Sequence, residues 1–134
     1  MDRISELVAD ALGQARLVRK CLDARIVPLL DPRHRTFATD ISRRIAARTI
    51  VTEAFLRDLE AFIVLLGKEV DEGSSLAWHG HEHDSDCGYA VPVRSERARA
   101  LQLVLDKLVD LATAVEAALD AAEACAIANS LFEK

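Results

Sequence analysis

A long stretch without helix-breaking residues constrains the fold of this chain more than any other feature. From Ser95 to Leu131 the sequence contains neither Gly nor Pro. Ser95 is a good N-cap, and a helix of this length measures about 55 Å at about 1.5 Å per residue. Apolar residues recur along it at steps of three and four, at Leu101, Val104, Leu105, Leu108, Leu111, Val115, Leu119, Ala122 and Ala126. The pattern predicts one amphipathic helix over about 95–132.

Two earlier segments show the same periodicity. The first predicts a helix over about 3–27, ended by Pro28 and Pro32. The second predicts a helix over about 38–66, with Asp40 as its cap and Gly67 just past its end. Residues 68–94 show no regular period, have room for a short fourth element, and look extended only at 89–93. We therefore expect an all-α fold, an antiparallel bundle of three long helices in a single domain over residues 1–134.

The third predicted helix also suggests an oligomer. The first helix, at about 36 Å, is too short to cover it. Small side chains let helices approach closely, so we predict a homodimer packed through this helix. The alternative is that alanine only supplies helix propensity. The small residues form two ridges, Ala114, Ala118, Ala122 and Ala126 in one and Ala117 and Ala121 in the other.

Composition excludes several classes of protein. The 134 residues carry 17 Lys and Arg against 22 Asp and Glu, a net charge of −5, which disfavours nucleic-acid binding through net charge. No stretch of 18 apolar residues free of charge is present, and the N-terminus lacks the pattern of a secretory signal, so we expect no membrane contact and a cytoplasmic protein. The three cysteines form no CxxC pair, and we expect Cys21 and Cys125 to be small core residues.

The strongest chemical signal lies between Trp78 and Cys87. Here His79, His81 and His83 alternate, and Cys87 follows two carboxylates. Imidazole, thiolate and carboxylate suit zinc, nickel or copper, and alternating residues face one side of an extended chain. The spacing matches no standard zinc motif. The segment is therefore a structural metal site, an open site that activates water as in a metal-dependent hydrolase, or a solvated polar loop.

The expected topology keeps the fourth histidine away from this segment. In a bundle of three antiparallel helices, the first and second connections lie at opposite ends. His34 is in the first connection, so we expect it not to complete a metal site within one chain.

A cluster of arginines precedes and enters the second predicted helix. It consists of Arg33, Arg35, Arg43, Arg44 and Arg48. We expect these cations to pair with Glu116, Asp120 and Glu123 of the third helix, within one chain or across a dimer. The alternative is that Arg43, Arg44 and Arg48 contact an anion or a partner molecule.

No catalytic motif is evident, and we predict no catalytic residues. The sequence lacks a nucleophile elbow, a phosphate-binding glycine loop, a dinucleotide fingerprint and paired ExxH motifs. The leading hypothesis is a homodimeric interaction or adaptor module that binds a protein partner. The second is a transition-metal-binding protein for sensing, storage or delivery, and a metal-dependent hydrolase is third.

Overall fold

The computed structural model describes residues 3–22, 26–72, 74–81 and 84–132, and along the two strands it describes the course of the backbone. The elements are α1 (Arg3–Cys21), a short 3-10 helix η1 (Val27–Leu29), α2 (Pro32–Ala46), α3 (Glu53–Glu72), β1 (Ser74–His81), β2 (Asp84–Arg94) and α4 (Glu96–Phe132). The body of the molecule is helical, as predicted. The described residues form four α-helices, however, and not three.

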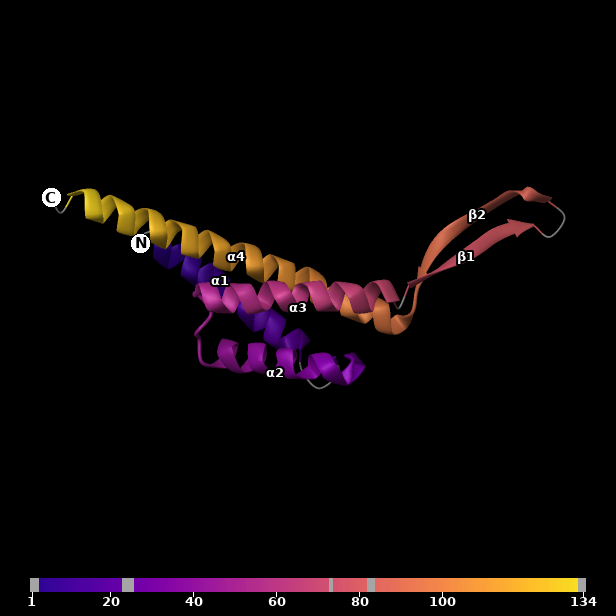
Figure 1. Cartoon of the computed structure of the whole chain (residues 1–134), viewed down its shortest axis with the longest axis horizontal. Helices are drawn as coiled ribbons and strands as arrows, with labels where there is room; N and C mark the ends of the chain where they lie inside the picture. Colours follow the sequence, from indigo (N-terminus) through magenta and orange to yellow (C-terminus); the bar gives the residue numbers. More distant parts are fainter. Residues whose placement is uncertain (1–2, 23–25, 73, 82–83, 133–134) are drawn as a thin grey trace.

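Successive helices run in opposite directions (Figure 1). The long helix α4 packs along both α1 and α3, while α2 lies beside α1 and α3. No described helix has both the length and the apolar character needed to cross a membrane. The arrangement is an up-down-up-down bundle, in which the first and third connections lie at the same end.

The predicted helix over 38–66 is divided because the chain reverses direction at residues 47–52. Arg48 has a positive φ of 60°, and its N–H donates to the Ile45 carbonyl at 3.0 Å. Four β-branched residues follow over 49–52, and such side chains favour extended backbone. Thr52 then begins α3, because its Oγ1 accepts a hydrogen bond from the N–H of Phe55 at 3.1 Å.

The start of α2 also differs from the prediction. Pro32 was expected to end the preceding helix, but it is the first residue of α2. Proline is favoured there because the N–H groups of the first turn have no partner within the helix, so the missing N–H of proline costs nothing. Asp31 provides the cap predicted for Asp40, since its Oδ1 accepts from the N–H of Arg33 at 3.0 Å. Asp40 lies within α2.

Two predicted helix ends are also wrong. The first helix ends at Cys21 and not near residue 27. The second predicted end, at Gly67, lies inside α3, which continues to Glu72. The start of α4 agrees with the prediction, because Ser95 Oγ accepts from the N–H of Ala98 at 3.0 Å.

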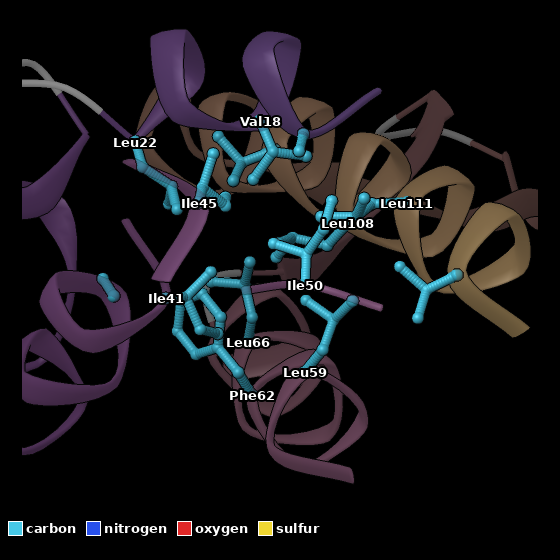
Figure 2. Close-up of a cluster of buried hydrophobic side chains, with 14 of the residues drawn as sticks. Val18, Leu22, Ile41, Ile45, Ile50, Leu59, Phe62, Leu66, Leu108 and Leu111 are labelled. Carbon is cyan, nitrogen blue, oxygen red and sulfur yellow. The ribbon is translucent and has the colours of Figure 1, made fainter. Parts of the chain in front are cut away.

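All four helices contribute to one hydrophobic core (Figure 2). Phe55 and Phe62 of α3 have no exposed surface, and neither does Ile50, which anchors the connection between α2 and α3. Cys21 is partly buried against this core, close to the prediction. The prediction for Cys125 is wrong, because its position on α4 is exposed. The other labelled core residues are Val18, Leu22, Ile41, Ile45, Leu59, Leu66, Leu108 and Leu111.

The predicted loop over 68–94 is largely a β-hairpin. β1 and β2 pair antiparallel from Ser74 with Arg94 to His79 with Tyr89. The extended character expected at 89–93 is confirmed. The hairpin extends away from the bundle at the end where α3 stops and α4 begins (Figure 1).

At the opposite end, α4 extends beyond its neighbours, as its length predicted (Figure 1). Its 37 residues span about 55 Å, whereas the 19 residues of α1 span about 28 Å. Every residue from Ala122 to Leu131 is exposed. We refer to residues 122–131 as the projecting end of α4. Two of the four residues of the first alanine ridge, Ala114 and Ala118, are buried against the other helices of the same chain.

Candidate functional site

The backbone of the hairpin carries three of the four predicted metal ligands. His79 pairs with Tyr89, and the next pair is His81 with Asp84. Cys87 therefore belongs to the extra residues of β2 that lie opposite Gly80, where the register shifts. His83 lies outside the described residues. The side chains of His79, His81 and Cys87 also lie outside the part of the chain whose side chains are described. Within residues 3–22, 26–72 and 95–131, no three His, Cys, Asp or Glu side chains are gathered as a metal ion requires.

A buried carboxylate at the base of the hairpin joins three elements of the bundle. The side chain of Glu69, near the end of α3, is only 3% exposed. Its Oε1 accepts from Arg97 Nη2 of α4 at 2.6 Å and from the backbone N–H of Asp31 at 2.7 Å. Its Oε2 lies 2.8 Å from His34 Nδ1 of α2. We call this group the Glu69 junction.

The junction satisfies the polar atoms that it buries. An ionised carboxylate can only accept, so the Nδ1 of His34 is the donor in its hydrogen bond with Glu69. Arg97 supplies the opposite charge, and its Nε also donates to the Leu29 carbonyl at 2.6 Å. A buried charge with this many partners avoids most of the desolvation penalty of an isolated one.

The position of His34 corrects the topological expectation. Because the bundle has four helices, the start of α2 and the end of α3 share one end of the molecule. His34 therefore lies beside the base of the hairpin and not at the far end. It is engaged with Glu69, and its side chain is 13% exposed.

A second charged pair lies next to the junction. Arg33 Nη2 and Asp31 Oδ2 are 2.9 Å apart, and Arg33 Nε donates to Asp31 Oδ1 at 3.1 Å. Hydrogen bonds from the side chain and the backbone of Arg33 hold the pKa of the Asp31 carboxyl well below its usual range. The same pairing raises the pKa of Arg33. Asp31 thus stays ionised as the cap of α2.

The predicted arginine cluster is neutralised by carboxylates other than those expected. Arg43 pairs with Asp40, and Arg44 pairs with both Asp40 and Asp58, the latter at 2.7 Å. Among the described residues, no ion pair joins this cluster to Glu116, Asp120 or Glu123. Arg48 is exposed and pairs with no described carboxylate.

Glu116, Asp120 and Glu123, which form no ion pair with the arginine cluster among the described residues, lie where the projecting end of α4 leaves the bundle. A groove of about 560 Å³ runs there between the start of α3 and α4. Leu56, Leu119 and Ala122 provide its apolar lining. Its acidic lining consists of Glu53, Glu116, Asp120 and Glu123. We call it the α3–α4 groove.

The projecting end carries mostly apolar side chains, with Glu123, Asn129 and Ser130 as its polar residues. Ile127 is 56% exposed and Leu131 is 72% exposed. Ala122, Cys125 and Ala126 lie at spacings of three and four, and they continue the stripe that Leu111, Val115 and Ala118 bury inside the bundle. The apolar stripe of a helix is normally buried against another element.

Comparison with known proteins gives no match. No protein family matches the chain, and no curated protein or solved structure is similar to it.

Sequence reasoning missed the Glu69 junction, although a signal was present. Phe55, Leu59, Phe62 and Leu66 mark the buried stripe of α3, and Glu69 continues it three residues later. A carboxylate at a core position requires charged or hydrogen-bonding partners. Those partners, His34 and Arg97, are distant in sequence, so the pattern indicates a buried ion pair without identifying it.

Proposed function

We propose that this protein is a helical interaction module that self-associates through the projecting end of α4. The observation that carries the proposal is the full exposure of residues 122–131, which include Ile127 and Leu131. The exposed apolar side chains of this segment remain in contact with water in a single copy. Packing against a partner would bury part of this apolar surface.

A second copy of the chain fits this surface best. The projecting end spans about 15 Å, and a copy related by a twofold axis presents an identical end. In an antiparallel pairing, Ala122, Cys125 and Ala126 of the two copies face one another. The small side chains allow the two α4 backbones to approach closely.

The α3–α4 groove adjoins this contact. In the antiparallel arrangement, the tip of one α4 lies at the groove of the other copy, beside Leu119 and Ala122. This orientation also keeps the acidic linings of the two grooves at opposite ends of the contact, whereas a parallel arrangement brings like charges together.

The proposal predicts a dimer that depends on Ala126. At micromolar concentration, sedimentation equilibrium of the full chain should give about twice the 14.7 kDa of one copy. Ala126→Glu should raise the dimer dissociation constant about a hundredfold or more, because each copy then places a carboxylate in the close contact between the two helices.

Leu103→Glu is the matched control. Leu103 is 69% exposed on the same helix but lies within the bundle region, far from the projecting end. The dimer should persist in this variant. A wild-type monomer at high micromolar concentration, or an equal loss of dimer in both variants, would contradict the proposal.

Metal binding by the hairpin is the second candidate. It is favoured by the register, which pairs His81 with Asp84 and leaves Cys87 among the extra residues opposite Gly80. Imidazole, carboxylate and thiolate are ligands that zinc, nickel and copper accept. We propose this site as an independent property of the hairpin in a cytoplasmic protein.

Native mass spectrometry with zinc, nickel or copper tests the second candidate. The wild-type chain should bind about one ion, and His81→Ala should weaken binding by orders of magnitude while the helical circular dichroism is unchanged. Ser85→Ala, in the adjacent strand β2, is the control. Unchanged metal binding in His81→Ala would rule out the proposed ligand set. A metal-dependent hydrolase would also require a hydrolytic activity that is lost when a chelator removes the metal.

A further inference from the structure

A narrow cleft between α1 and α2 gathers three arginines. Its volume is about 170 Å³, and Leu12, Ala15 and Ile45 form apolar parts of its wall. Its cationic lining consists of Arg16, Arg19 and Arg48. Arg16 and Arg19 lie three residues apart on α1, so their side chains are neighbours on the helix surface. Arg48 reaches the cleft from the end of α2. We call this the arginine cleft.

The three arginines differ from most others near them in having no described carboxylate partner. Arg33, Arg43 and Arg44 each form an ion pair with an aspartate. Within residues 3–22, 26–72 and 95–131, no carboxylate forms an ion pair with Arg16, Arg19 or Arg48. Three guanidinium groups lining one cleft repel one another unless an anion lies between them.

The backbone of Arg48 is a second and separate observation. Its φ of 60° lies in the left-handed region that favours glycine. The turn is otherwise well formed, because the N–H of Thr49 donates to the Arg44 carbonyl at 3.0 Å. An arginine therefore occupies a position where a residue without a side chain is less strained. Strain of this kind at an exposed cation is consistent with a binding role for its side chain.

We propose that the arginine cleft binds an oxyanion of the phosphate class. Guanidinium groups present planar pairs of donors that match phosphate oxygens, and three cations suit a group that carries up to two negative charges. The cleft volume is several times the roughly 30 Å³ that a water molecule occupies in the liquid. The apolar wall excludes part of the competing water, which strengthens the ionic contacts.

The partial negative charge at the C-terminal end of α2 disfavours a bound anion only weakly. A helix C-terminus carries about half a negative charge, which disfavours a bound anion. Here the carbonyls of Arg43, Arg44 and Ile45 all accept hydrogen bonds from the turn that follows. Three full positive charges therefore outweigh the partial negative charge of the helix end.

Arg48→Gly separates binding from folding. In chloride buffer this variant should unfold at a higher temperature than wild type, because glycine relieves the positive φ. Inorganic phosphate should raise the unfolding temperature of wild type above that in sodium chloride of equal ionic strength. In the variant, the phosphate dissociation constant should rise about tenfold or more, as expected when one charged donor is lost.

Two further variants complete the test. Arg16→Gln combined with Arg19→Gln should weaken phosphate binding at least as much as Arg48→Gly. Arg57→Gln removes an exposed cation of α3 outside the cleft and should leave phosphate binding unchanged. Phosphate stabilisation that is equal in wild type and Arg48→Gly, or that sodium chloride reproduces in wild type, overturns the proposal.

A comparison of two phosphate sources identifies the natural ligand class. A phosphoserine peptide that binds more tightly than inorganic phosphate indicates a phosphate carried by a protein. Equal dissociation constants indicate a small phosphorylated molecule. Both results support the arginine cleft as a phosphate site, provided that Arg48→Gly weakens the binding of the phosphate group in each case.

Discussion

At the scale of single residues, Glu69 connects more of the molecule than any other described polar side chain. It contacts α2 through His34, α4 through Arg97 and the cap of α2 through the backbone of Asp31. Removal of one member of a buried charged group leaves the others without their partner. The junction therefore makes the hairpin end of the bundle depend on one carboxylate.

Glu69→Ala should lower the free energy of unfolding by about 2–4 kcal/mol, because it removes a buried acceptor from three donors. The loss stays below the upper limit for fully buried pairs, since the Arg97 side chain is 38% exposed. Urea denaturation measures the change. Glu60→Gln, at an exposed position on the same helix, should change stability by less than about 0.5 kcal/mol. A loss equal to that of Glu60→Gln would contradict the role assigned to the junction.

The lowered pKa of the Asp31 carboxyl predicts how the stability of the protein depends on pH. Hydrogen bonds from Arg33 lower the pKa of its carboxyl in the folded protein. The stability that this carboxylate contributes is therefore fully present above the unfolded pKa of about 4, and it is lost as the pH falls toward the lower, folded value. The difference in unfolding free energy between wild type and Asp31→Ala should be constant from pH 5 to 8 and shrink below pH 4. A difference that grows in acid would show that the shift has the opposite sign.

At the scale of elements, periodicity predicted where helices occur better than where they end. The limits of α4 agreed with the sequence because Ser95 and the absence of Gly and Pro mark them clearly. The break between α2 and α3 was missed because apolar residues continue through it, with Ile50 buried like a helical core residue. The signal that could have located it is the β-branched run over 49–52 and the capping position of Thr52.

Gly67 shows how a strong local signal can be overridden. Glycine commonly follows a helix end, yet α3 continues past Gly67 because Val70 is buried in the core and Glu69 is held in the junction. Tertiary contacts of this kind cannot be read from the local sequence. They also explain why the buried partners of Glu69 could not be predicted.

Gly67→Ala should stabilise the protein by about 0.5–1 kcal/mol, because alanine loses less backbone entropy in a helix. A Cβ at this position meets no atom within 4 Å. Thermal or urea unfolding measures the gain, and Gly13→Ala in α1, where a Cβ also meets no atom, should give a similar one. Destabilisation by Gly67→Ala would show that α3 is not a continuous helix at this point.

At the scale of the whole molecule, the bundle has different surfaces at its two ends. The hairpin extends from one end, and the apolar end of α4 extends from the other (Figure 1). The sequence predicted the overhang of α4 from helix lengths alone. It did not predict that Ala114 and Ala118 would be buried within the chain, because the pattern cannot distinguish packing within one chain from packing between two copies.

The antiparallel contact between two α4 ends is tested most directly through Cys125, which is exposed near the centre of the projecting end. Mild oxidation of the full chain, followed by non-reducing electrophoresis, should give a disulfide-linked dimer in wild type and in Cys21→Ser. The linked dimer should be absent in Cys125→Ser. A linked dimer that persists without Cys125, or none in wild type at concentrations where it sediments as a dimer, would contradict the proposed contact.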